Sequence, residues 1–197
     1  MYNLIQMDGT IRAFIAIELT GQAHDELACL QSALQKAGAD VKWVEPEKIH
    51  LTLRFLGDLV PEKAEELKKI LAETAAGANP FELTMKDIGA FPGLSSPRVI
   101  WAGVGLGAAE ATRIAETIET KLQTIGIPKE ERKFHPHMTL GRVRSPKNCE
   151  KLRGIIETIK FEAGSKINVD HLTLFRSRLT PQGSIYTPLF KASMIIS

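Results

Sequence analysis

The tetrapeptide HLTL at residues 50–53 recurs, with one conservative change, as HMTL at residues 137–140. Each copy lies in an apolar run that is typical of a β-strand. Alternate side chains of a strand point to the same face. Each copy therefore presents a histidine and a threonine together on one face and two apolar side chains on the other. The sequence thus predicts two matched histidine–threonine pairs.

The segments around the two copies repeat in the same order. A strand pattern, a helical pattern, the tetrapeptide strand, a second helical pattern and a closing strand follow one another twice. The first histidine comes 38 residues after Arg12 and the second comes 39 residues after Arg98. We therefore expect an α+β fold with two pseudo-symmetric lobes, each with an antiparallel sheet and two helices, around a central cleft. One domain would span residues 1–197, with duplicated halves at about 11–91 and 98–175 and with lobes that are interleaved in sequence.

The alternation of strands and helices leaves a second fold open. A doubly wound parallel sheet also alternates strands with helices. We rank it below the duplicated α+β fold, because the duplication explains the paired motifs better.

Composition and charge are those of an ordinary globular chain. Hydrophobic residues make up 44% and charged residues 24%, and the formal net charge is +2, so neither disorder nor strong nonspecific nucleic-acid binding is expected. Cys29 and Cys149 fit no disulfide or metal spacing and are expected to be reduced thiols. Neither a signal peptide nor an apolar run of about 20 residues is recognisable. We expect a cytoplasmic monomer that makes no use of a membrane.

The paired motifs predict acid–base chemistry on phosphorus. Histidine titrates near pH 6.5, so His50 and His137 can hold opposite protonation states and each contribute about 10²–10⁴ in rate. The hydroxyls of Thr52 and Thr139 can donate hydrogen bonds to non-bridging phosphate oxygens. In-line displacement places the entering and leaving oxygens on opposite sides, which suits two opposed histidines. A strained cyclic phosphate is a natural substrate for such a site.

Two arginines near the motifs are candidate phosphate ligands. Arg54 shares strand parity with His50, so it is expected to face the cleft. Arg142 has the wrong parity relative to its histidine unless Gly141 introduces a bulge. Parity predicts that Phe55 points away from the histidine face.

Two further patterns are set aside. A third copy, HLTL at residues 171–174, aligns with the closing strand of the first half, where His171 matches Asp87. A polar role on a strand face is therefore expected for it.

His135 and His137 share a face, but no acidic residue or cysteine joins them nearby in sequence. We expect neither a metal ion nor a cofactor.

Four segments together resemble the two-histidine (2H) phosphoesterase superfamily, and in particular the RNA 2′,3′-cyclic phosphodiesterases that are also called 2′-5′ RNA ligases. The resemblance covers the chain after residue 10. It rests on RAFIAIEL at 12–19, HLTLRFLGD at 50–58, FHPHMTLGR at 134–142 and LFRSRLTPQGSIYTPL at 174–189.

This resemblance implies a bilobal fold around a cationic cleft and metal-independent hydrolysis of an RNA 2′,3′-cyclic phosphate to a 2′-phosphomonoester. It implies His50 as proton donor and His137 as proton acceptor. It further implies that Thr52 and Thr139 contact the phosphate, and that Arg142 binds it.

Three alternatives remain open from the sequence. The same site could join RNA ends in the reverse, ligase direction, because one active site lowers both barriers. It could hydrolyse a small cyclic nucleotide. A noncatalytic module that binds RNA ends would need the basic cleft but not both histidines.

Overall fold

The structure is a computed structural model that describes residues 10–19, 21–181 and 183–195. Its elements alternate as the sequence predicts, with a short 3₁₀ helix before the first motif strand. In chain order the elements are β1 (Ile11–Glu18), α1 (Gly21–Gln35), β2 (Val41–Trp43), η1 (Pro46–Lys48), β3 (His50–Leu59), α2 (Pro61–Ala76), β4 (Phe81–Leu83), β5 (Met85–Phe91), β6 (Val99–Val104), α3 (Ala108–Thr124), β7 (His137–Val143), α4 (Cys149–Thr158), β8 (Ile167–Val169), β9 (His171–Thr180) and β10 (Gly183–Ser193).

The strands of the main sheet follow the order β10-β9-β1-β3-β7-β6-β5, and β2 pairs with β7. Strands β4 and β8 form a separate two-stranded sheet. Every strand pairing within the described residues is antiparallel. The parallel doubly wound alternative is therefore wrong, and the predicted α+β class is confirmed.

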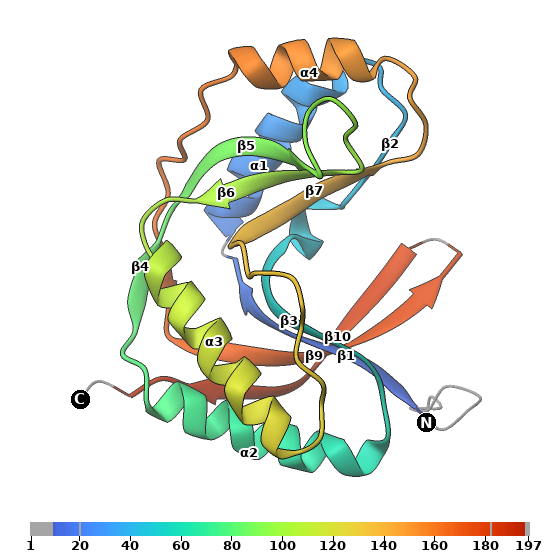
Figure 1. Cartoon of the computed structure of the whole chain (residues 1–197). Coiled ribbons are helices and arrows are strands. Elements are labelled where there is room, and N and C mark those ends of the chain that lie inside the picture. Colours follow the sequence, from blue (N-terminus) through green and yellow to red (C-terminus); the bar gives the residue numbers. More distant parts are fainter. Residues whose placement is uncertain (1–9, 20, 182, 196–197) are drawn as a thin grey trace.

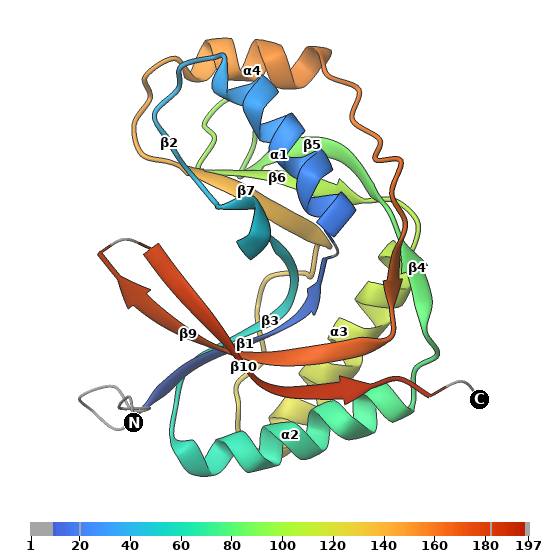
Figure 2. The ribbon, with the colours of Figure 1, turned by 180° about the vertical axis from the view of Figure 1, so that it is seen from behind.

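The two motif strands meet at the middle of the sheet and separate two lobes. The first lobe consists of β1, β3, β9 and β10 with α2 and α3. The second consists of β2, β5, β6 and β7 with α1 and α4, and Figures 1 and 2 show the two lobes from opposite sides. Each half of the chain contributes to both lobes, since β5 lies beside β6 and β9 lies beside β1. The bilobal architecture expected from the paired motifs is thus present.

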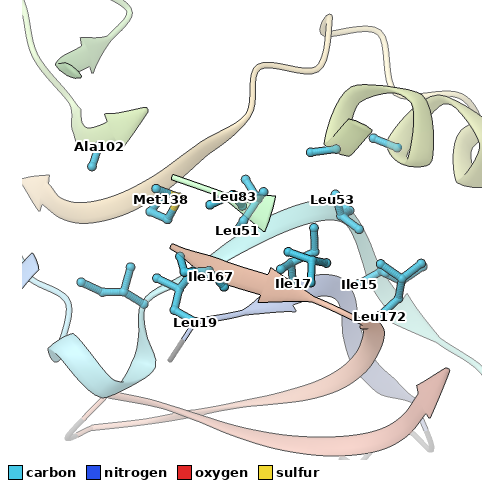
Figure 3. Close-up of a cluster of buried hydrophobic side chains, with 14 of the residues drawn as sticks. Ile15, Ile17, Leu19, Leu51, Leu53, Leu83, Ala102, Met138, Ile167 and Leu172 are labelled. Carbon is cyan, nitrogen blue, oxygen red and sulfur yellow. The ribbon is translucent and has the colours of Figure 1, made fainter. Parts of the chain in front are cut away.

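The apolar face of the motif strands forms the centre of the core. Leu51 and Met138 are each 0% exposed and pair with one another across the junction of the lobes. Ile15, Ile17 and Leu172 pack in the same cluster (Figure 3). Burying an aliphatic side chain of this size stabilises the fold by about 1.5–3 kcal/mol. This burial fixes which face of each motif strand is apolar, and so directs the alternate, polar side chains to the other face.

Candidate active site

The two motifs lie side by side on β3 and β7, joined through their central apolar residues. Leu51 pairs with Met138 in antiparallel register. In such a pair, residues one step to either side of the bridge lie across from one another. The register therefore sets each motif histidine across from the threonine of the other copy, and the two histidines occupy diagonal corners of a four-residue group on the polar face.

A cavity of about 450 Å³ opens over this group. Its lining includes His50, Thr52, Thr139 and Arg142. His137 is not among the lining residues, although it shares a face of β7 with Thr139 two positions later. The cavity also touches β1, β9 and β10 of the first lobe, through Arg12, Ala13, Phe14, Ser177, Leu179, Ser184 and Tyr186.

His50 is held by one hydrogen bond and by the aromatic rings around it. Its Nδ1 lies 2.8 Å from the carbonyl oxygen of Lys48. A carbonyl only accepts, so Nδ1 carries the hydrogen, and Nε2 of the neutral ring is left as an acceptor. The imidazole stacks on Phe14 at 4.8 Å and meets the edge of Tyr186 at 5.2 Å between ring centroids. The ring is thereby fixed in both tautomer and orientation.

His137 is held in a matching way by the second lobe. Its Nδ1 lies 2.6 Å from the carbonyl oxygen of His135, which again leaves Nε2 as the free nitrogen. The ring of Phe91 meets it edge-on at 4.9 Å. Both motif histidines therefore anchor Nδ1 on the backbone two residues earlier and keep Nε2 for a ligand.

Burial lowers the pKa of both motif histidines. For His50, loss of solvent lowers the pKa and the hydrogen bond to Lys48 only partly offsets it. For His137, burial again lowers the pKa most strongly; the hydrogen bond to the His135 carbonyl opposes this, while electrostatic interactions with His135 and Arg142 lower the pKa further. Both rings are therefore biased toward the neutral form, in which Nε2 can accept a proton.

A β-bulge at Leu53 corrects the prediction for Arg54. Thr52 pairs with Ala16 and Arg54 pairs with Ile15, so Leu53 is an extra residue opposite no partner on β1. The extra residue reverses the strand parity beyond it. Arg54 therefore points to the α3 side of the sheet and is absent from the cavity lining.

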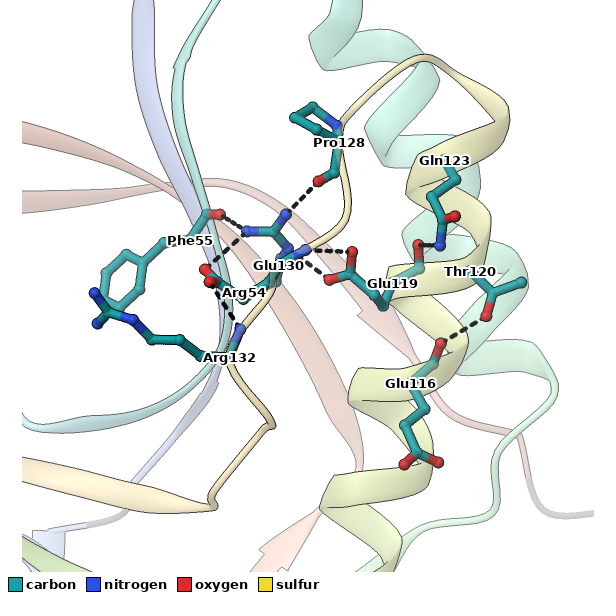
Figure 4. A network of polar contacts seen from close by, with 9 residues as sticks. All are labelled: Arg54, Phe55, Glu116, Glu119, Thr120, Gln123, Pro128, Glu130 and Arg132. Atoms are coloured by element: carbon teal, nitrogen blue, oxygen red, sulfur yellow. Dashed lines mark hydrogen bonds and ion pairs between the residues drawn. The ribbon is translucent and has the colours of Figure 1, made fainter.

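The Arg54 guanidinium binds acidic side chains and a backbone carbonyl on the α3 side of the sheet (Figure 4). Its Nε lies 2.7 Å from Glu119, and a nitrogen of the fork donates to the carbonyl oxygen of Pro128 at 2.7 Å. Glu130 forms a longer ion pair at 3.6 Å. With its side chain 12% exposed, Arg54 ties the connection before β7 to α3, and its assignment as a phosphate ligand was wrong.

The same bulge brings Phe55 into the cavity, where parity had predicted that it would point away. Phe55 pairs with Phe14, and their rings lie 5.9 Å apart. The side chain is 57% exposed and lines the cavity. An exposed aromatic ring therefore borders the histidine–threonine group.

The second motif strand carries the equivalent bulge. Thr139 pairs with Trp101 and Gly141 pairs with Ile100, so Leu140 is the extra residue. It stands three residues after its histidine, as Leu53 does in the first copy. The bulge that sequence reasoning required at Gly141 thus occurs one residue earlier, and Arg142 lines the cavity.

His171 of the third HLTL copy joins a separate polar cluster on β9. Its Nε2 lies 2.7 Å from Glu18 and its Nδ1 lies 2.5 Å from Asp170, and Thr173 donates to Glu18 at 3.1 Å. Burial alone would lower the pKa of His171, but the hydrogen bonds to Asp170 and Glu18 outweigh it and raise that pKa. Both ring nitrogens are thus bonded to carboxylates in a network that lies outside the cavity lining.

Sequence reasoning missed Arg12 as a cavity residue. Arg12 shares the face of β1 that carries Phe14, and it lines the cavity. The alternation in RAFIAIEL indicates that Arg12 and Phe14 share a face of β1. Which face lines the cavity follows only from the pairing of β1 with β3, and a helix separates these two strands in the sequence.

Within the residues that the structure describes, His, Cys, Asp and Glu side chains form no group of three or more that could hold a metal ion. None of the described helices is long and apolar enough to cross a membrane.

Comparison with known families and proteins gives one consistent result. Residues 17–101 and 105–186 match the family described as LigT like Phosphoesterase. The chain is 36% identical over 180 residues to a protein of Methanothermobacter thermautotrophicus named RNA 2′,3′-cyclic phosphodiesterase, covering 91% of this chain and 96% of that protein. A Thermotoga maritima protein of the same name is 36% identical, with 92% and 94% covered.

Solved structures agree in fold. A crystal structure of a Thermus thermophilus protein superposes with a TM-score of 0.80 at 28% identity, covering 93% of this chain and 98% of that one. The crystal structure of Escherichia coli LigT complexed with 3′-AMP gives a TM-score of 0.75 at 25% identity, with 94% and 98% covered.

Proposed function

Because the chain belongs to the family of LigT-like phosphoesterases, we propose that it is an RNA 2′,3′-cyclic phosphodiesterase that works without a metal ion. The relatives named for that activity align along almost the whole chain. The observation that carries the proposal is the diagonal arrangement of two histidines, both with Nδ1 anchored on backbone carbonyls, beside a cavity that contains an arginine.

The reaction is an in-line displacement by water at the cyclic phosphorus. His137, as the neutral ring, accepts a proton from water through Nε2 while the water oxygen bonds to phosphorus. The bond from phosphorus to O3′ breaks, and His50, as imidazolium, donates its Nε2 proton to O3′. The product is a 2′-phosphomonoester with a free 3′-hydroxyl. Exchange of protons with solvent then restores both rings.

The remaining motif residues stabilise charge on the phosphoryl group. Thr52 and Thr139 donate hydroxyl hydrogen bonds to the non-bridging oxygens, where charge must be held in the transition state. Arg142 adds a planar guanidinium that matches phosphate geometry. Its positive charge also helps to keep His137 unprotonated and ready to act as base.

The negative charge of the bound phosphodiester supports the role of His50 as proton donor. Burial lowers the pKa of this ring in the free protein. A negatively charged phosphodiester in the cavity favours the imidazolium form and opposes that shift. Substrate binding therefore raises the fraction of His50 that can donate.

The domain and its setting complete the proposal. We take residues 1–197 as a single two-histidine phosphoesterase domain built by duplication, acting as a monomer in the cytoplasm on RNA or oligonucleotide ends. The order of the sheet supports the duplication, because β9, β1 and β3 of one lobe mirror β5, β6 and β7 of the other.

Product analysis on a short RNA with a 2′,3′-cyclic end tests this function. We expect a 2′-phosphate product, formed at an unchanged rate in excess chelator. A 3′-phosphate product, or loss of activity on chelation, contradicts the mechanism. Joined RNA formed in excess over hydrolysed ends would instead favour the ligase direction, and turnover restricted to small cyclic nucleotides would favour that alternative.

A further inference from the structure

The cavity extends well beyond the group of motif residues. Its lining includes His50 and Thr139 as well as Arg12, Leu179 and Ser184, and the strand register places the last three toward the opposite end of β1 from His50. Its volume of about 450 Å³ is in the range of sites that enclose a whole organic ligand. A cyclic phosphate alone occupies only the motif end, so the far end is available to another part of the substrate.

Arg12 at the far end is an uncommitted cation. Within the described residues its guanidinium forms no ion pair and no side-chain hydrogen bond, in contrast to Arg54. Asp58 lies opposite Arg12 in the strand register, yet the two side chains form no ion pair. An arginine that lines a cavity with its donors unused is suited to bind an anionic ligand.

The register fixes how far Arg12 lies from the phosphate site. Thr52 pairs with Ala16, and Arg12 lies four residues further along β1. Four residues of extended strand span roughly 13 Å. Phe14, whose ring contacts His50, lies between these two positions on β1, so Arg12 projects from the strand beyond the ring that borders the motif residues and is positioned for a different phosphate further along the RNA.

The wall between the two ends is apolar and exposed. Phe55 and Leu179 are 57% and 63% exposed, and both line the cavity. Tyr186 continues this surface toward His50. Aromatic and apolar surface flanked by arginine is how proteins hold single-stranded RNA, with bases on the rings and the backbone on the cations.

We propose that Arg12 binds the phosphodiester linkage between the last two nucleotides of the RNA. The proposal rests on the proposed function and deepens it, because it assigns a residue to a second phosphate of the substrate and gives a physical reason for a preference for an oligonucleotide end over a cyclic mononucleotide. The RNA runs from the motif residues along β1 and leaves beside the β9–β10 hairpin, which projects past the sheet in Figure 1.

Three substrates test this inference: adenosine 2′,3′-cyclic phosphate, a dinucleotide that ends in the same cyclic phosphate, and that dinucleotide with an uncharged methylphosphonate linkage. Because a charge-assisted contact is gained, the wild-type kcat/KM should be about tenfold higher for the dinucleotide than for the mononucleotide. The methylphosphonate should lose most of this advantage.

Arg12→Ala should lower kcat/KM about tenfold on the charged dinucleotide, mainly through KM, since the contact is remote from the reacting bond. Its effect on the mononucleotide should be less than about threefold. Arg12→Lys should retain part of the preference, and Arg12→Ala should add no further loss on the methylphosphonate.

Arg178→Ala is the matched control. Arg178 lies between Ser177 and Leu179 on β9, and since both of these line the cavity, Arg178 points to the opposite face. Its removal should leave all three substrate ratios unchanged. Equal losses on mononucleotide and dinucleotide in Arg12→Ala, or full activity on the methylphosphonate, would overturn the Arg12 assignment while leaving the phosphodiesterase function intact. Absence of turnover on every substrate would overturn the function and the Arg12 proposal with it.

Discussion

Thr52 and Arg54 stand two positions apart on one strand, and their side chains lie on opposite faces of the sheet. The bulge at Leu53 separates them. The second motif repeats the device at Leu140, where Thr139 and Arg142 lie on one face although they are three positions apart. A β-bulge at the equivalent position of each motif strand thus turns Arg54 away from the cavity and directs Arg142 into it.

Replacing these two arginines should have different consequences. Arg142→Ala should lower kcat/KM about 10²-fold by removing a charge-assisted phosphate contact, with little change in thermal unfolding. Arg54→Ala should lower the free energy of unfolding by about 2–4 kcal/mol, because Glu119 is left mostly buried without its partner. Steady-state kinetics and denaturant unfolding of both variants make the comparison. A larger catalytic defect in folded Arg54→Ala than in Arg142→Ala would contradict the bulge-based assignment.

The pH dependence of kcat/KM should be a bell centred below pH 6.5. Histidine ordinarily titrates near that value, and both motif rings have a lowered pKa in the free protein. Activity should persist as the pH falls below 6.5, until the base becomes protonated. It should decline toward neutral pH as the donor loses its proton. The pKa values that the acidic and basic limbs of the bell report are those of the coupled pair of histidines, and neither value is assigned to a single ring. A kcat/KM that still rises above pH 8 would exclude a required imidazolium donor.

The motif threonines should matter through their hydroxyls. Thr52→Val and Thr139→Val keep the shape of the side chain and remove one donor each, so each should lower kcat by about 10–10²-fold. Serine at either position retains the hydroxyl and should recover most of the rate. Stopped-flow or quenched assays on a cyclic-phosphate RNA end provide the comparison. Valine variants as active as the serine variants would assign the threonines to packing alone.

His171 should contribute to stability in a pH-dependent way. Its pKa is raised in the folded protein, so its contribution is fully present below the unfolded value near 6.5 and is lost as the pH rises through the raised folded value. The His171→Gln variant should be less stable than wild type by about 0.5–1 kcal/mol at pH 6, because the network is partly solvent-exposed. The difference should shrink by pH 9, as measured by urea unfolding. A difference that grows with pH would contradict the carboxylate network.

Periodicity was sufficient to predict the lobes and the paired motifs. Alternation in HLTL and HMTL identifies which side chains share a face, and the core burial of Leu51 and Met138 enforces it. The third copy aligns with a closing strand and not with a motif strand, and the structure places it on β9 beside β1. These features follow from local pattern and spacing, which the sequence carries directly.

The bulges could not be predicted from the sequence. Leu53 and Leu140 continue a regular apolar alternation, and only their pairing with β1 and β6 reveals the extra residue. Strand parity alone therefore places Arg54 in the cavity and Phe55 outside it, whereas the structure has Phe55 in the cavity and Arg54 outside it. Arg12 was missed for a related reason, since its place in the cavity depends on which strands pair across a long separation in sequence.

The most direct test of the account is single-turnover hydrolysis of an RNA 2′,3′-cyclic end by His50→Asn, His137→Asn and the double variant, with circular dichroism to verify folding. Each single variant should lose about 10²–10⁴ in rate. The double variant should lose little more, because the two rings act as one unit. A folded single variant that keeps more than about a tenth of the wild-type rate would contradict paired acid–base catalysis.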